Sequence, residues 1–213
     1  EMLGNFSFGD YFKQEAIEFA WELSLEGFGF DPERIWISVF GGDEELGLGP
    51  DIEAIEIWRA LGVPDERIVE LPRSENFWQA GDKGPCGPCS ELYLDRGERF
   101  GTAEDRPGGD NDRFLEYWNL VFTAYELRAD GSLTDLPAKN IDTGLGLERM
   151  AAIQQGVDSV FDTDLLRPLV DLGAELSGRA YDGDDPAATR ALRIIADPLR
   201  GTVDLIADGV VPS

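Results

Sequence analysis

The stretch that decides the fold runs from Asn140 to Arg149 and reads NIDTGLGLER. Its first five residues, NIDTG, are expected to end a strand. The residues that follow, LGLERMAAIQQG, have helical spacing and stop at Gly156, a residue type that commonly lies just past a helix. The stretch therefore predicts a strand that turns directly into a helix.

Several residues of this stretch can carry chemistry. Gly144 and Gly146 have no Cβ, so a ligand can approach the backbone closely. The carboxylate of Asp142 can hold an ammonium group, and the guanidinium of Arg149 can hold phosphate or stack on a base. Taken alone, short glycine patterns of this kind more often mark an ordinary strand-to-helix turn, with Arg149 in a surface ion pair.

The residues before this stretch alternate between strand patterns and a few helices. Strongly β-branched or aromatic runs predict strands, and apolar residues at helical spacing predict helices. Strand patterns occupy Met2–Phe12, Arg34–Phe40, Arg67–Leu71, Ser90–Asp95 and Arg113–Arg128, and helix patterns occupy Tyr11–Glu26 and Ile52–Leu61. The segment Trp78–Pro88 is dense in Gly and Pro and is predicted to form turns, and Gly97–Asp112 is predicted to be a long polar loop. Because regular crossover helices are missing between the strands, we expect an antiparallel sheet and the α+β class.

The pattern becomes helical from Phe161 onward. One apolar stripe holds Leu165, Leu169, Leu172 and Leu176, and a second holds Leu192, Ile195, Leu199, Val203 and Ile206. We therefore place a domain boundary near Gly156–Asp162, with one domain over residues 1–157 and a helical one over residues 158–213. Pro198 lies inside the second stripe, and proline interrupts helical hydrogen bonding, so a helix break is predicted near Asp197.

The composition limits the function. The chain has 213 residues, 43 acids, 18 bases and no histidine. The absence of histidine excludes Ser-His-Asp, Cys-His and histidine-metal chemistry within this chain. A net charge of −25 is most simply a solvated surface, and it predicts poor nucleic-acid binding by this chain alone and no DNA partner. Two cysteines, no signal-peptide pattern and no long apolar run predict a cytoplasmic protein without a membrane partner.

Five segments in order carry a resemblance to one family. They are MLGNFSFGDYFK (Met2–Lys13), NFWQAGDKGPCGPCSE (Asn76–Glu91), EYWNLVF (Glu116–Phe122), NIDTGLGLERMAA (Asn140–Ala152) and LIADGVVPS (Leu205–Ser213). Together they resemble alanyl-tRNA synthetase, and TGLGLER resembles the third signature motif of the class II aminoacyl-tRNA synthetases. The resemblance implies a class II antiparallel sheet, ATP-dependent activation of alanine to alanyl-adenylate, and transfer to tRNA(Ala).

The resemblance also implies roles for individual residues. Asp142 would hold the ammonium of alanine, and Trp78, Asn119, Val121 and Gly144 would line a small amino-acid pocket. Gly146 and Arg149 would contact ATP, with Arg149 as the catalytic residue.

Metal ions are implied less directly. Mg²⁺ would accompany ATP, with Glu91 and Glu116 as candidate ligands. The pair Cys86 and Cys89 has metal-ligand spacing, but zinc normally needs four ligands, so we expect two free thiols in a tight turn. The zinc of the family is expected only in its editing region, beyond this chain.

The sequence departs from the family pattern in several places. It begins Glu1-Met2-Leu3, and we expect a fragment in which the first motif and the arginine-bearing strand of the second are missing. Such a piece should be weak or inactive alone. Lys83 stands where the family usually has threonine, and Pro198 where it usually has histidine. Two alternatives remain: a non-catalytic paralogue that binds alanine or adenylate, and a structural fragment whose acidic surface mediates assembly.

Overall fold

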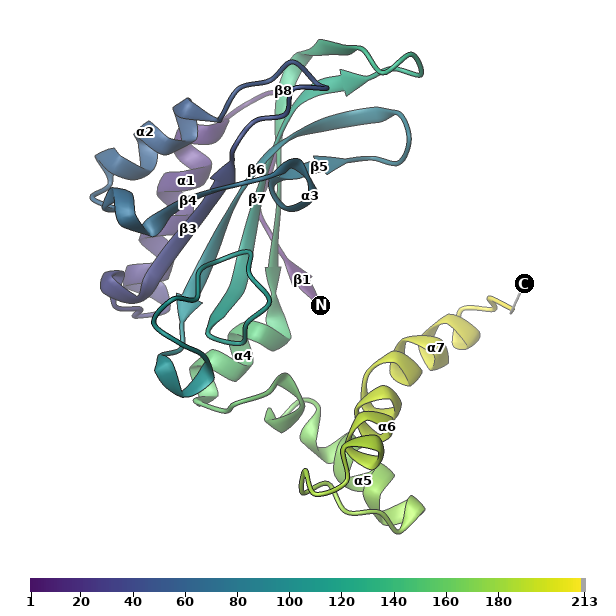
Figure 1. Ribbon diagram of the computed structural model, residues 1–213. Helices are drawn as coiled ribbons and strands as arrows, with labels where there is room; N and C mark the ends of the chain where they lie inside the picture. Colours follow the sequence, from purple (N-terminus) through teal and green to yellow (C-terminus); the bar gives the residue numbers. More distant parts are fainter. Residues whose placement is uncertain (212–213) are drawn as a thin grey trace. The chain divides into compact units, whose positions relative to one another are not determined.

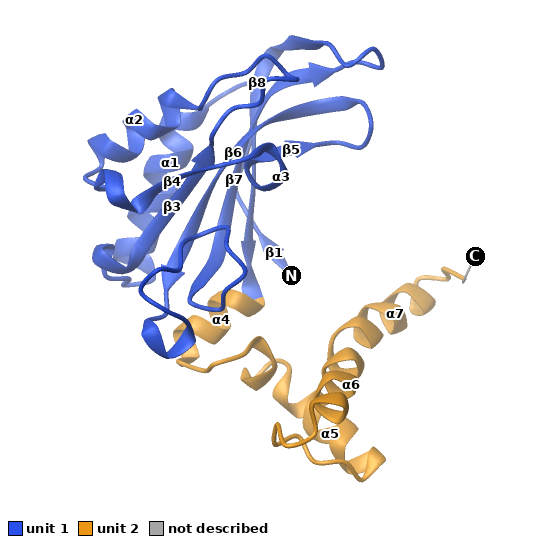
Figure 2. Cartoon of the chain, viewed as in Figure 1, with its two compact units in different colours: residues 1–147 blue, residues 148–213 orange. Residues whose placement is uncertain are grey.

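The computed structural model describes residues 1–211 and divides the chain into two compact units. The first unit comprises residues 1–147, and the second begins at residue 148 (Figure 2).

The first unit is built on one eight-stranded sheet (Figure 1). Its main path runs β1-β8-β7-β6-β3-β4, with β2 paired to β8 and β5 paired to β6. The strands are β1 (Met2–Leu3), β2 (Phe6–Phe8), β3 (Ile35–Phe40), β4 (Ile68–Leu71), β5 (Phe77–Gln79), β6 (Gly84–Asp95), β7 (Phe114–Leu127) and β8 (Leu133–Gly146). All pairings are antiparallel except that of β3 with β4. The predicted α+β class with a mostly antiparallel sheet is confirmed.

Helices α1 (Lys13–Glu22) and α2 (Ile52–Ala60) lie on one side of this sheet (Figure 1). The Nε1 of Trp58 on α2 donates to the Oγ of Ser90 at 2.9 Å, which fixes which side of β6 the helices cover. A buried ion pair of 2.7 Å between Lys13 Nζ and Asp51 Oδ1 joins the starts of the two helices. Since side chains alternate across a strand, Glu91 faces the other side, where the four-residue helix α3 (Arg73–Asn76) lies.

The prediction of turns over Trp78–Pro88 is confirmed only at residues 80–83 and is wrong for the rest of the segment. Residues 77–79 form β5, and β6 already begins at Gly84. The strand accommodates its prolines through a register shift between Cys86 and Cys89 opposite β7, which breaks the regular ladder. Gly87 permits this close packing, because a Cβ there would lie 2.0 Å from the carbonyl oxygen of Phe122. Both cysteines are buried and free, as predicted, but they lie in a bulged strand rather than in a tight turn.

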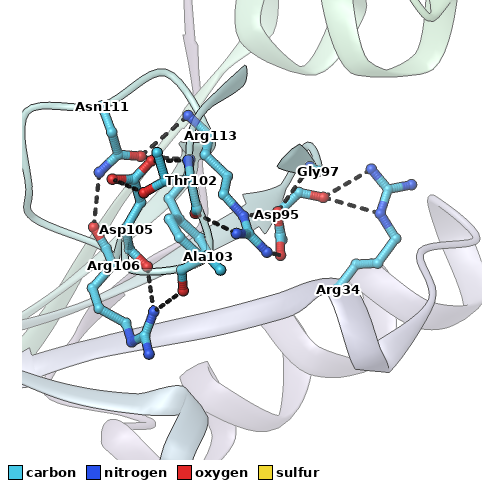
Figure 3. Close-up of polar contacts among 10 residues, drawn as sticks. Arg34, Asp95, Gly97, Thr102, Ala103, Asp105, Arg106, Asn111 and Arg113 are labelled. Carbon is cyan, nitrogen blue, oxygen red and sulfur yellow. Dashed lines mark hydrogen bonds and ion pairs between the residues drawn. The ribbon is translucent and has the colours of Figure 1, made fainter. Parts of the chain in front are cut away.

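The predicted polar loop between β6 and β7 is confirmed, and arginines order it (Figure 3). Arg113 donates to both carboxylate oxygens of Asp95, at 2.8 and 2.7 Å, and also to the carbonyl oxygen of Thr102. Within the loop, Arg106 donates to the carbonyl oxygens of Ala103 and Asp105. The loop, which includes a short 3₁₀ turn over Glu98–Phe100, is therefore a structured element.

The second unit is helical. It contains most of α4 (Leu147–Gln155), then α5 (Arg167–Ser177), α6 (Pro186–Ala196) and α7 (Pro198–Ala207). The predicted break near Asp197 is confirmed, because α6 ends at Ala196 and α7 begins at Pro198. Leu192 and Leu169 contribute to a small core with Val170 and Ala196, but most other members of the predicted stripes are half exposed. The last two residues of the family-like segment Leu205–Ser213 lie outside the described residues.

No helix within residues 1–211 is long and apolar enough to cross a membrane.

Candidate functional site

The sheet face opposite α1 and α2 carries a row of polar positions. Ser38 on β3, Glu91 on β6, Asn119 on β7 and Gly144 on β8 are successive partners in the strand register. Facing positions of adjacent strands project to the same side, so these residues line one band across the sheet.

A second row runs beside the first. Cys89 on β6, Val121 on β7, Asp142 on β8 and Phe6 on β2 are successive register partners. Asp142 is exposed, and within residues 1–211 its side chain makes no hydrogen bond or ion pair. The structure therefore brings four of the predicted amino-acid-site residues together on β7 and β8. They are Asn119, Val121, Asp142 and Gly144.

Trp78, the fifth predicted pocket residue, lies on β5 opposite Gly87 and is 40% exposed. Its strand pairs with the part of β6 that precedes Cys89, which itself pairs with Val121. The Trp78 ring thus comes from the β5–β6 hairpin, and it is exposed enough to form the wall of a pocket.

Gly144 keeps the backbone of β8 accessible on this face. A Cβ at this position would lie 2.5 Å from the Cε of Met2, and apart from Gly144 and its two chain neighbours no other heavy atom of residues 1–211 lies within 4 Å of it. Met2 is 63% exposed, and its Cε is the end of a flexible side chain. The surface above Gly144 is thus occupied only by a group that can move aside.

Glu91 is buried at the centre of a hydrogen-bond cluster. Its Oε2 accepts from the Oγ of Ser38 at 2.8 Å and from the hydroxyl of Tyr93 at 2.7 Å. Its Oε1 accepts from the Nδ2 of Asn119 at 3.3 Å. Burial, and secondly the charge of Glu116, raise the pKa of Glu91 to about 7, although the hydrogen bonds from Tyr93 and Ser38 oppose this.

Asn76, at the end of α3, extends this cluster. Its Nδ2 donates to the Oγ of Ser38 at 2.9 Å and to the carbonyl oxygen of Cys89 at 3.3 Å. Because Ser38 receives this bond, its own hydroxyl hydrogen is directed to Glu91. The same cluster leaves two buried carbonyl oxygens, Asn76 Oδ1 and Asn119 Oδ1, without a hydrogen-bond partner in the described structure.

The magnesium candidates do not form a metal site by themselves. Among residues 1–211, no group of three or more His, Cys, Asp or Glu side chains could hold a metal ion. Both oxygens of Glu91 already accept hydrogen bonds from protein donors, so this carboxylate does not fit a magnesium ligand. Glu116 lies on the same face, opposite Tyr93 in the register.

The predicted ATP contacts lie at the end of β8 and beyond it. Gly146 is the last residue of β8, and Arg149 is an exposed residue in the first turn of α4. Arg149 belongs to the second unit. Its contact with ATP stays a prediction.

Sequence reasoning missed Phe6, Ser38, Asn76 and Tyr93. Phe6 is 55% exposed beside Asp142 and offers an aromatic surface. The signal for Ser38 was present, since it interrupts the apolar strand pattern RIWISVF. Asn76 could not have been found this way, because only the path of the chain through α3 brings it to Ser38.

Known proteins resemble this chain over its full length. A family model described as tRNA synthetases class II (A) matches residues 1–213. The alanine–tRNA ligase of Rubrobacter xylanophilus is 54% identical, and the match covers all of this chain and 25% of that protein. The alanine–tRNA ligases of Frankia alni and Thermobifida fusca are each 52% identical, again over the whole chain and over 24% of their own length.

The chain thus spans about a quarter of the length of these curated relatives. The match to the family model and the mostly antiparallel sheet agree with the resemblance seen in the sequence motifs. This chain belongs to the class II (A) tRNA synthetase family.

Proposed function

We propose that this chain provides the amino-acid-activating part of an alanine–tRNA ligase. In the first half-reaction, the carboxylate of L-alanine attacks the α-phosphorus of ATP, forming the acyl–phosphate bond of alanyl-adenylate while pyrophosphate leaves. In the second, a ribose hydroxyl at the end of tRNA(Ala) attacks the acyl carbon, and AMP leaves. Neither step needs a nucleophile from the protein, so a chain without histidine can perform them.

The observation that carries this proposal is the position of Asp142. An exposed carboxylate with no protein partner in residues 1–211 lies beside an open glycine, on the sheet face opposite the helices. A carboxylate in this position can hold the ammonium of alanine and orient its carboxylate toward ATP. The names of the similar relatives support alanine as the amino acid.

The size of the pocket is proposed to select alanine. Val121 and Trp78 would form the wall that excludes larger side chains. Each additional methylene gives only about 1–3 kcal/mol of discrimination, so steric exclusion by a rigid wall is more effective than attraction. Val121 suits this role because it is nearly buried in β7 and is β-branched.

For ATP, we propose that Gly146 allows close approach of the nucleotide and that Arg149 contacts it. Mg²⁺ would neutralise phosphate charge, with Glu116, which pairs with Tyr93 in the strand register, as a candidate ligand. We propose residues 1–157 as the adenylate-forming domain and residues 158–213 as the start of a tRNA-recognition region. A cytoplasmic location is proposed from the two cysteines and from the sequence, which shows no signal-peptide pattern.

The test is alanine-dependent exchange of pyrophosphate into ATP by the protein that carries this sequence. The expected result is exchange that requires L-alanine and is abolished by Asp142→Ala. Exchange that depends on a different amino acid would contradict the proposal. Saturable alanine binding without any exchange would favour a non-catalytic paralogue instead.

A further inference from the structure

We propose that Glu91 is a positioning residue that orients the side-chain amide of Asn119 so that its carbonyl oxygen accepts a hydrogen bond from the ammonium of the bound amino acid. This role differs from that of a metal ligand, and it rests on the proposed alanine site.

The two carboxylate oxygens of Glu91 accept hydrogen bonds from different partners. Ser38 and Tyr93 both donate to Oε2. Oε1 is left for Asn119, whose Nδ2 lies 3.3 Å away. Above its pKa of about 7, the Glu91 carboxyl is ionised and can only accept, so the edge of the amide that faces it is then the NH₂ edge.

The orientation of the amide then follows. If the Asn119 amide were turned over, its Oδ1 would face Oε1 of Glu91, and two acceptors would repel each other. With Nδ2 held by Glu91, Oδ1 is directed elsewhere. This oxygen is buried and has no hydrogen-bond partner in the described structure. A buried polar atom left unsatisfied is costly, so a ligand donor at this point would be favoured.

The location of Asn119 identifies that donor. Asn119 pairs with Gly144, and its next same-face neighbour on β7, Val121, pairs with Asp142. An ammonium held by Asp142 has three N–H donors, of which one carboxylate uses only part. The amide oxygen of Asn119 supplies a second acceptor on the same face, above a glycine covered only by the movable end of Met2.

The test measures binding of L-alanine and of MgATP to the full chain by calorimetry, with wild type and two variants of Glu91. Glu91→Met keeps the length and burial of the side chain but cannot accept from Asn119. Glu91→Gln retains an acceptor oxygen for Nδ2. We expect Glu91→Met to weaken alanine binding about tenfold or more, with the MgATP dissociation constant changed by less than about twofold. Glu91→Gln should restore alanine binding to within about threefold of wild type.

Three controls distinguish positioning from other roles. Glu66→Met, at an exposed carboxylate in the 3₁₀ turn Asp65–Arg67, should change neither affinity. Asn119→Ala should weaken alanine binding similarly, and the double variant Glu91→Met with Asn119→Ala should be no weaker than Asn119→Ala alone. Equal weakening of alanine and MgATP binding, or a Gln variant no better than Met, would overturn the positioning role.

The outcome also separates this proposal from the function on which it rests. If wild type binds alanine and Glu91→Met binds it with the same affinity, the positioning role alone is overturned. Wild type that does not bind alanine overturns both. If Glu91→Met does not fold, hydrogen exchange of the Asn119 side-chain NH₂ in wild type decides. Slow exchange is expected for a buried hydrogen-bonded amide, and exchange as fast as that of a solvent-exposed amide overturns the role.

Discussion

Asp142 and Val121 face each other directly across β8 and β7, one exposed and charged, the other nearly buried and apolar. This pairing places a carboxylate beside a surface that can contact a methyl group, as an alanine site requires. Since Asp142 has no side-chain partner within residues 1–211, removing its charge should leave the fold intact.

Asp142→Asn is therefore expected to weaken the binding of L-alanine while leaving the stability of the fold nearly unchanged. A hydrogen bond to a charged group contributes about 1.5–3 kcal/mol, so the dissociation constant of L-alanine should rise by about 10- to 150-fold. The free energy of unfolding should change by less than about 0.5 kcal/mol. Calorimetry and urea titration measure the two quantities, and a large loss of stability with unchanged alanine affinity would argue for a structural Asp142.

Two glycine substitutions form a matched pair. Gly144→Ala requires only the terminal methyl of Met2 to move, so the melting temperature should change little while alanine binding weakens. Gly87→Ala would bring a Cβ within 2.0 Å of a backbone oxygen of Phe122, and β6 and β7 would have to separate. We expect a loss of more than about 3 kcal/mol of stability or failure to fold. Thermal unfolding of both variants measures this contrast, and equal stability would contradict it.

The buried carboxyl of Glu91 predicts a pH-dependent stability. Its folded-state pKa is raised from its ordinary value of 4.5 to about 7, chiefly by burial. A raised carboxyl pKa means that the folded protein binds the proton more tightly than the unfolded chain does. The corresponding contribution to stability, about 3 kcal/mol, is complete below pH 4.5 and is lost as the pH rises through about 7.

Glu91→Gln should remove this dependence. The difference in unfolding free energy between wild type and Glu91→Gln should shift against wild type between pH 4.5 and 7. Comparing the two proteins at each pH cancels the effects of the other acids. A difference that stays constant with pH would show that Glu91 titrates normally in the folded state.

The loop between β6 and β7 should depend on Arg113 (Figure 3). The hydrogen bonds from Arg113 lower the pKa of Asp95, so this pair stabilises the fold above the ordinary aspartate pKa and less as the pH falls. Arg113→Ala should cost about 1–3 kcal/mol. It should also speed hydrogen exchange in residues 97–112, with β3 unaffected. Arg128→Ala, at an exposed arginine outside the loop, is the control, and equal exchange in both variants would contradict the anchoring role of Arg113.

The sequence predicts much of this fold because strong local patterns agree with the tertiary structure. The strand over residues 114–127, the helix break before Pro198 and the end of α4 just before Gly156 each follow from residue type and spacing. The NIDTGLGLER stretch also predicts the strand-to-helix junction, which lies between Gly146 and Leu147, two residues later than expected.

The failures have a common physical cause. The segment Trp78–Pro88 looks like turns locally, yet pairing with β7 and a register shift hold much of it in strands. Likewise, Glu91 could be recognised as an acid but not as the centre of a buried cluster, because Ser38 and Asn119 reach it from two other strands and Asn76 reaches Ser38 from α3. Contacts between neighbouring strands determine both features, and the register of those strands cannot be read from a single sequence.

The most direct measurement is calorimetric titration of the chain with L-alanine, for wild type and Asp142→Asn under identical conditions. Binding that saturates in wild type, weakens by about 10- to 150-fold in Asp142→Asn and is absent for L-leucine is the expected result. Wild type that does not bind L-alanine, or an Asp142→Asn variant that binds it equally well, would contradict an amino-acid site on this face of the sheet.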